Sequence, residues 1–482
     1  MPPEPPVKLM AANIQKELAE IDLGDERRDR RILRLASRMA ESPSRSLRAA
    51  CGGWGDAIAA FRLLHSPKVT SDKILDSHRQ ATLKRAEASN HLLFIDDTTE
   101  LDYSSHKALT GVGRLDHDFR RGFYAHNHLL VDEDSGVALG LYGSKIWTRD
   151  PETPKHDHKD LPFEKKESYR WYEGYVQACD LVAEHTDLAV VYVGDSESDI
   201  HELYVEHARR RDAGEAVADL VLRTGRDRAL PEKGQHLFAH VRNAPELGGL
   251  PLNISTKIRR KKVTLPGKGK TSRMVERTAR IANLTIRAAT VTLRAPYRKH
   301  GGKLPPVEVN VVLVREENPP EGQEPIEWVL LTTLPVDNLA QAWRVIQAYV
   351  RRWLIEEFHR ILKSGCRVEQ IQLREGNALL CGVALYMIVA WRILYLRDLS
   401  RGAPELPCTL FFSEAEWRAA CIIRRKPLGT SPPSLKEVVE MVGKIGGHMG
   451  RKKDPPPGPE CLWRGLEKLR HYVEMGQALG AL

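Results

Sequence analysis

Two apolar runs that each end in aspartate place the strongest constraint on how this chain can fold. The first is HLLFIDDTT, residues 91–99, and the second is LAVVYVGD, residues 188–195. Short runs of this kind, bounded by acid, are typical of strands buried on both faces. A stretch with helical periodicity, YRWYEGYVQACDLVAEH, precedes the second run. The pattern predicts an α/β core, in which functional groups collect at the carboxyl ends of strands. Asp97 and Asp195 both occupy such positions.

The flanking regions follow different patterns. Residues 1–88 show helix-period apolar positions and a densely basic segment, GDERRDRR, which predicts a helical N-terminal domain suited to DNA. Alternating runs and Gly/Pro-rich joints at about 207–337 predict an antiparallel β subdomain inserted into a catalytic domain of residues 89–372. Residues 373–482 are predicted to be a helical C-terminal domain.

Charge and composition narrow the classes of partner. The net charge is +9 and the pI about 9.1, which favours a polyanion such as nucleic acid over a membrane surface. The N-terminus lacks the pattern of a secretory signal. The longest apolar run, ALLCGVALYMIVAW, is shorter than the roughly 18 residues of a membrane span and is interpreted as a buried core helix. Seven cysteines without a CxxC pair indicate free thiols in a reducing cytoplasm.

The segment YVRRWLIEEFHRILKSG, residues 349–365, is predicted to form one uninterrupted helix with an unusual charge distribution. At about 100° per residue, Tyr349, Arg352, Glu356 and Lys363 fall within a sector of roughly 60°. One interpretation is an ordinary surface helix in which Arg352 and Glu356 form an i,i+4 ion pair. The other is a functional face.

Three carboxylates, Asp97, Asp195 and Glu356, support the functional interpretation. Mg²⁺ sites for phosphoryl transfer use a few carboxylates and leave positions open for water and phosphate oxygens. Each acid taken alone is also consistent with a cap, a turn or a surface charge. The nearby HNH sequence places His126 and His128 on one face of a strand, where a packed pair is a simpler account than a metal site.

These residues together carry a family resemblance. The order DDTT, GDSESDIHELY and YVRRWLIEEFHRILKSG resembles the DDE transposases of the IS-four insertion-sequence family. The last segment matches that family's YREK signature, YxxRxxxExxxxxxK, with its spacing intact. LGDERRDRR and AAFRLLHSPKVT resemble the DNA-binding domain, PELGGL and ENPPEGQEPIEWVLLTTLPV the β insertion, and IGGHMG with the last helix the C-terminal domain.

The resemblance implies a fold, a cofactor and partners. It implies an RNase H-like core in which Asp97, Asp195 and Glu356 hold Mg²⁺, with Mn²⁺ able to substitute. The expected partners are double-stranded transposon ends, target DNA and a second copy of the chain in a synaptic homodimer. Ser196 stands where the family usually has arginine, which puts one arginine contact in doubt.

The resemblance also assigns roles outside the three acids. Tyr349, Arg352 and Lys363 are expected to hold DNA phosphates, Arg223 to contact DNA near the active site, and Trp328 to insert where a base is flipped out. The N-terminal residues expected to bind the transposon end are Arg27, Arg28, Arg31 and Arg62.

Two questions remain open at this level. The last helix places Leu462, Leu466, Leu469 and Val473 near one face, which suits either packing within the chain or contact in the dimer. The function predicted is cut-and-paste transposition with a hairpin step. The alternatives are a catalytically silent DNA-binding or inhibitory relative and a metal-dependent nuclease without strand transfer.

Overall fold

The computed structural model divides the chain into two compact units. The first contains Met1–Lys159, Val176–Val191 and Arg351–Leu482, and the second contains Asp160–Tyr175 and Tyr192–Val350. For residues 253–254, 257–265 and 269–277 only the backbone is described. The structure describes residues 14–41, 43, 46–51, 53–117, 119–149, 161–254, 257–265, 269–277, 279–297, 302–452 and 454–480.

The first unit begins with helices, as the sequence predicts. They are α1 (Ile14–Glu17), α2 (Glu26–Glu41), α3 (Leu47–Ala50), α4 (Trp54–Leu64) and α5 (Ser71–Ala86). In α2 the apolar residues recur at helical spacing, and Ile32, Leu35 and Met39 are buried. Thr70 caps α5 by accepting a hydrogen bond from the Lys73 amide, which fixes where that helix begins.

The strands of the first unit form an antiparallel arrangement around β3. They are β1 (His91–Asp102), β2 (Gly113–Arg114), β3 (Arg121–Asp132) and β4 (Ala138–Trp147). β3 pairs with each of the other three. The segment from Leu92 to Ile95 is completely buried, as expected for a central strand. Gly140 lies against Thr82 of α5, at a separation too small for a Cβ atom, so α5 packs closely on β4.

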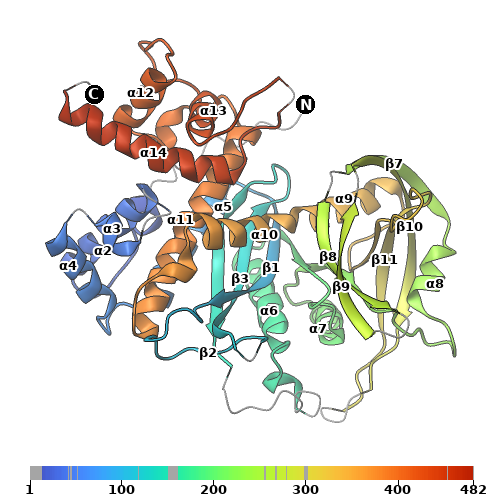
Figure 1. Ribbon diagram of the computed structural model, residues 1–482. Helices are drawn as coiled ribbons and strands as arrows, with labels where there is room; N and C mark the ends of the chain where they lie inside the picture. Colours follow the sequence, from blue (N-terminus) through green and yellow to red (C-terminus); the bar gives the residue numbers. More distant parts are fainter. Residues whose placement is uncertain are drawn as a thin grey trace. The chain divides into compact units, whose positions relative to one another are not determined.

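The remaining helices of the first unit surround one long core helix. They are α10 (Trp353–Arg360), the π-helical turn η3 (Ile361–Gly365), the 3₁₀ turns η4 (Val368–Gln370) and η5 (Cys408–Leu410), α11 (Gly376–Gly402), α12 (Glu414–Ile423), α13 (Leu435–Ile445) and α14 (Pro459–Ala478). By length and composition α11 could cross a membrane, but 89% of its most apolar window is buried inside the protein. Figure 1 shows it running through the unit, so the prediction of a core helix is confirmed.

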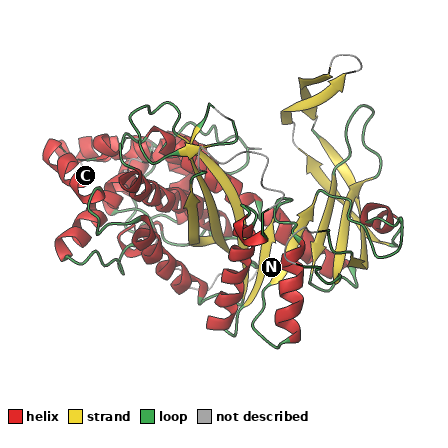
Figure 2. Ribbon diagram, turned by 90° about the horizontal axis from the view of Figure 1, so that it is seen from below, coloured by secondary structure: helices red, strands yellow, loops and turns green. Residues whose placement is uncertain are grey.

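The second unit contains an antiparallel sheet with the order β6-β12-β11-β10-β7. Figure 2 draws the strands of the molecule in yellow. A separate hairpin pairs β8 with β9. The unit's elements are the 3₁₀ turn η2 (Phe163–Lys165), α7 (His201–Asp212), β6 (Asp219–Thr224), α8 (Leu237–Arg242), β7 (Glu246–Ile254), β8 (Lys257–Leu265), β9 (Gly269–Arg277), β10 (Arg280–Leu293), β11 (Val307–Glu316), β12 (Glu327–Thr332) and α9 (Leu339–Arg351), whose last residue belongs to the first unit.

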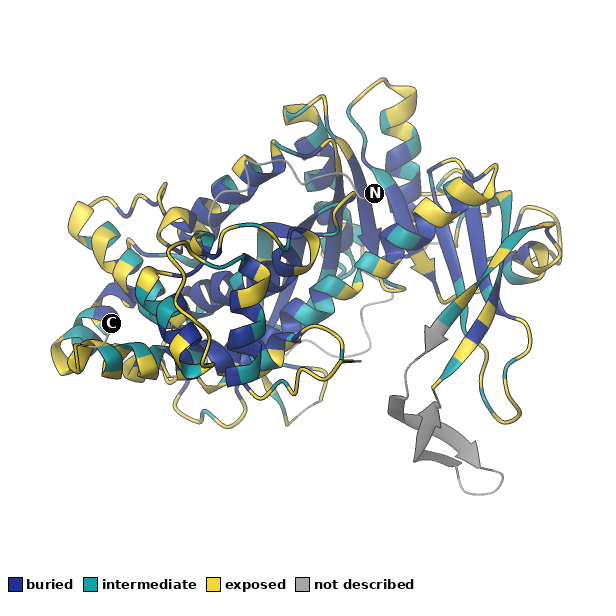
Figure 3. Ribbon diagram, turned by 90° about the horizontal axis from the view of Figure 1, so that it is seen from above, coloured by how far each residue is buried: buried dark blue, intermediate teal, exposed yellow. Residues whose placement is uncertain are grey.

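Two further elements, α6 (Tyr169–Glu184) and β5 (Ala189–Gly194), also cross the boundary between units. Figure 3 shows that the strands are mainly buried, whereas the outer helices expose one side. The α/β class predicted from the sequence is confirmed, with helical N-terminal and C-terminal regions, and is consistent with an RNase H-like core.

Candidate active site

The two consecutive aspartates of β1, Asp96 and Asp97, project from opposite faces of the strand because successive side chains alternate. Asp96 is buried, and its carboxylate lies between His126 (Oδ2 to Nε2, 3.1 Å) and His128 (Oδ1 to Nδ1, 2.7 Å). Burial alone would raise the pKa of Asp96, but the two imidazoles outweigh it and lower that pKa to about 2. Asp97 is half-buried, and its Oδ1 accepts a hydrogen bond from the Thr98 amide at 2.8 Å.

Arg352 connects Asp97 with Glu356. Its Nη1 lies 3.4 Å from Asp97 Oδ2, and its Nη2 donates to Glu356 Oε1. The i,i+4 pair expected on a surface helix therefore exists, but the Arg352 side chain is only 11% exposed and its guanidinium is shared with an acid 255 residues away. The first unit thus brings together three of the sequence-predicted site residues.

The prediction of one uninterrupted helix over 349–365 is wrong in detail. α9 ends at Arg351 and α10 begins at Trp353. At this junction the Ile355 amide bonds to the carbonyl of Arg352, three residues back, which tightens the turn. The final turn widens into a π-helix, in which the Cys366 amide reaches the Ile361 carbonyl five residues back. The tight turn and the π-turn lie at the two ends of α10, the helix that carries Glu356. Turns of the π type recur at functional sites.

Lys363 lies in the π-helical turn and is half-buried. Burial lowers the pKa of its ammonium group, while the carboxylates of Glu369 and Glu100 act in the opposite direction. The turn ends at Gly365, where a Cβ atom would come within 2.8 Å of the Trp463 ring of α14. Glycine therefore permits α14 to pack directly against the turn that carries Lys363.

Sequence reasoning missed Asn127, which is paired in register with Asp97 on the neighbouring strand β3. Paired residues of an antiparallel ladder project to the same face, so strand alternation could have found it. Its Oδ1 is buried and has no hydrogen-bond donor among the described residues. Asp97 and Glu356 offer oxygen donors, which suit a hard cation such as Mg²⁺ or Mn²⁺ rather than a zinc site built from nitrogen and sulfur.

Asp195 belongs to the second unit and directly follows β5. Its side chain organises a turn: Oδ1 accepts from the Glu197 amide at 2.8 Å, and its carbonyl accepts from the Ser198 amide and hydroxyl. Ser196 is exposed, and Glu197 pairs with Arg170 of α6 at 2.7 Å. The role of Asp195 beside Asp97 and Glu356 stays a prediction.

The other predicted residues of the second unit are Tyr349, Trp328 and Arg223. Tyr349 is buried, and its ring meets the half-buried Trp328 ring edge-on, with centroids 6.0 Å apart. Trp328 lies on β12 opposite Val314. Arg223 is exposed on β6.

The N-terminal arginines separate into different environments. Arg27 and Arg31 line a surface groove of about 290 Å³ on α2 and α4, together with Arg30, Arg34 and Arg38. Arg28 is not among the residues that line it, and its Nη1 donates to the Leu23 carbonyl at 3.0 Å. Arg62 is exposed but is not among the residues of the groove. Asp56 pairs with Arg38 at 2.6 Å, and that hydrogen bond lowers the pKa of its carboxyl group.

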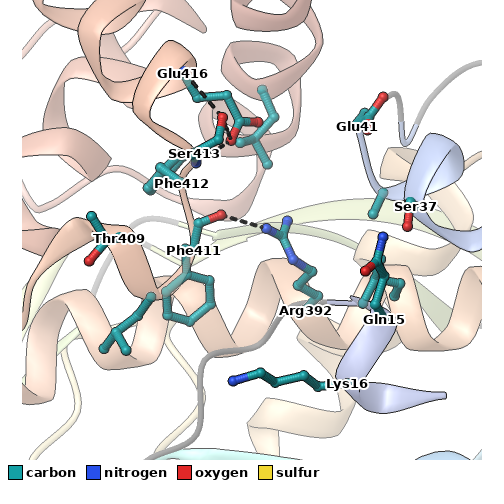
Figure 4. A pocket seen from close by; sticks show the side chains of 14 residues that line it. Gln15, Lys16, Ser37, Glu41, Arg392, Thr409, Phe411, Phe412, Ser413 and Glu416 are labelled. Carbon is teal, nitrogen blue, oxygen red and sulfur yellow. Dashed lines mark hydrogen bonds between the residues drawn. The ribbon is translucent and has the colours of Figure 1, made fainter. Parts of the chain in front are cut away.

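A second cavity, of about 420 Å³, lies where the N-terminal helices meet α11, α12 and α14. Figure 4 shows Arg392 extending into it, with the guanidinium donating to the Phe411 carbonyl at 3.0 Å. Lys16, Glu41 and Glu416 also line this cavity. It joins the N-terminal helices to the C-terminal helices and contains none of the predicted catalytic acids.

Three segments of the chain match known protein families. Residues 10–69 match the family described as transposase DNA-binding, residues 174–392 the transposase DDE domain, and residues 388–479 the transposase Tn5 dimerisation domain. Asp195 and Glu356 fall within the DDE match, and Asp97 precedes it. These matches define a DDE transposase, an enzyme that cleaves DNA and transfers strands with the help of divalent metal ions. The chain belongs to the Tn5-type DDE transposases, in which DNA-binding, catalytic and dimerisation regions follow one another.

Proposed function

We propose that the chain is a cut-and-paste transposase that binds the terminal inverted repeats of its transposon, nicks the DNA, forms a hairpin and transfers the 3′ ends to target DNA. Asp97, Asp195 and Glu356 are the proposed ligands of Mg²⁺, for which Mn²⁺ can substitute. The organisation proposed is a DNA-binding domain of residues 1–88, a catalytic domain of 89–372 with a β insertion at about 207–337, and a dimerisation domain of 373–482. The enzyme works as a homodimer on paired ends, in the bacterial cytoplasm at the nucleoid.

The observation that carries this proposal is the convergence of Asp97 and Glu356 on one guanidinium. Two half-buried carboxylates repel each other unless a cation lies between them. Arg352 supplies that charge in the structure. A surface helix has no need of such a partner, whereas a site for a divalent ion requires acids held close together.

The protein's part in the reaction is positioning and charge neutralisation. When bound, the metal ions activate water for nicking and then the freed 3′ hydroxyl for attack on the opposite strand. Arg352 offers a guanidinium fork that matches phosphate geometry, and Lys363 offers a compact charge. Burial favours the neutral form of Lys363, so a phosphate beside it would favour the charged form.

Alanine variants of the three acids test the proposal. Asp97→Ala, Asp195→Ala and Glu356→Ala should each abolish Mg²⁺-dependent nicking of a duplex that carries the inverted repeats flanking the gene. Binding to that duplex in a gel shift should be retained, because these residues do not dock the ends. Asp134→Ala, which removes an exposed acid from the turn after β3, is the matched control and should remain active. Full nicking by any of the three variants would contradict the metal-ligand assignment.

The same substrate separates the alternatives. A silent or inhibitory relative would bind the duplex without cutting it, and a nuclease would cut without joining the ends to target DNA. Cleavage, hairpin formation and joining by the unmodified chain are the results expected of the transposase.

A further inference from the structure

A hydrogen bond between Asn127 and His359 connects the strand beside Asp97 to the helix that carries Glu356. Asn127 Nδ2 lies 2.9 Å from His359 Nε2. Asn127 is completely buried, and His359 is 8% exposed. His359 follows Glu356 by three residues in α10, so the two occupy neighbouring positions on one turn of that helix.

The protonation of His359 fixes the direction of this bond. Burial lowers the pKa of His359 to about 3, with further contributions from the cations of Lys363, His126 and Arg352. The imidazole is therefore neutral at physiological pH. Its Nε2 accepts the proton that the Asn127 amide donates, and the ring proton resides on Nδ1. This orientation leaves Asn127 Oδ1 as a buried acceptor without a donor among the described residues, on the face of the sheet that carries Asp97.

We propose that Asn127 is a positioning residue for the metal site, acting through His359 to fix the separation of Asp97 and Glu356. This inference rests on the proposed function, since it needs the two acids to share a metal ion. The bond joins α10, which presents Glu356, to β3, the strand paired with the one that presents Asp97: Asn127 is the register partner of Asp97, and His359 shares a turn with Glu356.

The contact that Arg352 makes with the two acids cannot fix their separation alone. Arg352 connects Asp97 to Glu356 by charge, and a divalent ion bound between the acids competes with that guanidinium. The Asn127–His359 bond involves no acid and persists when a metal ion binds. On the other side, Arg397 of α11 anchors α10 through Glu357, the residue after Glu356. Helix α10 is thus held from the sheet by Asn127 and from the core helix by Arg397.

The experiment compares Asn127→Leu with a histidine series at position 359. Asn127→Leu removes the donor at similar volume, His359→Leu removes the acceptor, and His359→Gln restores an acceptor. The full-length proteins are titrated with Mn²⁺, and the free ion is measured by electron paramagnetic resonance. Asn127→Leu and His359→Leu should weaken Mn²⁺ binding about 10- to 100-fold, in the range typical of lost outer-shell contacts. His359→Gln should recover part of it, and the Asn127→Leu/His359→Leu double variant should bind no more weakly than the weaker single variant.

His78→Gln is the matched control, because His78 is another buried neutral histidine of the first unit and lies on α5. It should lower the melting temperature and leave Mn²⁺ binding unchanged. The positioning role is wrong if the Asn127 and His359 variants bind Mn²⁺ like the unmodified chain. It is also wrong if these variants and His78→Gln lose the same amount of Mn²⁺ binding when their melting temperatures fall equally. Equal Mn²⁺ binding by the unmodified chain and Asp97→Ala would instead refute the metal site itself.

Discussion

Arg352 reaches Asp97 across 255 residues of sequence, with Nη1 3.4 Å from Oδ2. The same guanidinium donates to Glu356, so one cation serves two acids that are the proposed metal ligands. In the absence of a metal ion this contact relieves the repulsion between the carboxylates. The arrangement sets the guanidinium in competition with any divalent cation for the same negative charge.

Removing this guanidinium should therefore have opposite effects on metal binding and on catalysis. Arg352→Gln should strengthen Mn²⁺ binding in the absence of DNA by about tenfold, equivalent to ~1.4 kcal/mol and well below the ~4 kcal/mol attraction of unit charges 4 Å apart at an effective dielectric constant of 20. Nicking should slow, because a phosphate contact is lost. Isothermal titration with Mn²⁺ and a nicking assay on one preparation provide both measurements.

The control for this variant is Arg360→Gln, which removes a guanidinium from the same helix. Arg360 is exposed and lies 3.7 Å from Glu357 rather than from a proposed ligand. The Arg360→Gln variant should change neither Mn²⁺ binding nor the nicking rate. Weaker Mn²⁺ binding by Arg352→Gln would mean that the guanidinium organises the acids instead of competing for them.

Local pattern predicted the strands and the acids at this site, but not the contacts between them. Asp97 follows from an apolar run ending in acid, and Glu356 from the spaced signature of the family that the sequence resembles. Strand alternation could have placed Asn127 on the face of Asp97, but its bond to His359 depends on packing between a strand and a helix 232 residues apart. Long-range packing of this kind has no periodicity that a sequence can display.

The sequence pattern also could not show that the helix predicted over 349–365 is interrupted. An ideal 3.6-residue period places Tyr349, Arg352, Glu356 and Lys363 in one sector. Such a regular period cannot represent the tight turn at Arg352 or the π-turn at Lys363. The close approach of Trp463 to Gly365 accompanies the wider turn. That contact comes from a helix nearly a hundred residues away, which no local pattern can indicate.

The groove on α2 and α4 provides a test of end binding. Arg27→Gln with Arg31→Gln should weaken binding to the inverted-repeat duplex and reduce the slope of log K against log salt by about 1.8, since each phosphate contact contributes about 0.9. Arg464→Gln is a matched control because Arg464 is exposed on α14 and lies outside the residues of the groove. A salt slope that falls for Arg464→Gln and stays constant for the double variant would place the DNA elsewhere.

Self-association should depend on the exposed residues of α14 rather than on its buried leucines. Leu462, Leu466 and Leu469 are buried within the chain, so the packing interpretation is confirmed for them, and Val473 is half-buried. Tyr472, Met475 and Leu479 are exposed and fall within about 60° of one another on the helix. Tyr472→Lys with Met475→Lys should reduce paired-end complexes and leave the melting temperature and single-end binding unchanged.

Leu469→Ala is the contrasting variant of the same helix. Truncating a buried leucine should cost about 2–5 kcal/mol of stability, and it should reduce paired-end and single-end complexes together. Sedimentation of the end complexes and thermal melting distinguish the two classes. Paired-end complexes that survive the double lysine substitution would exclude this face of α14 from the dimer contact.

The last prediction concerns Trp328, which is half-buried on β12 and contacts the Tyr349 ring edge-on. A tryptophan of the hydrophobic core would be enclosed, whereas this one keeps part of its surface available to a ligand. Extruding a base costs a few kcal/mol, and stacking on an aromatic ring returns roughly 1–3 kcal/mol per base. If Trp328 supports a flipped base during hairpin formation, its removal should affect that step and spare the nick.

Trp328→Ala should therefore leave first-strand nicking nearly unchanged and slow hairpin formation. A duplex with an abasic site at the flipped position should partly restore the rate of hairpin formation, because no base then has to be unstacked. Trp328→Phe should form the hairpin faster than Trp328→Ala and more slowly than the unmodified chain, since its smaller ring retains part of the stacking surface. Trp343→Ala removes a partly exposed tryptophan from α9 in the same unit and should alter neither step. Denaturing gels resolve nicked and hairpin products in one time course. Equal loss of both steps, or no rescue by the abasic duplex, would identify Trp328 as a packing residue, because support for a flipped base is needed only after the first strand has been cut.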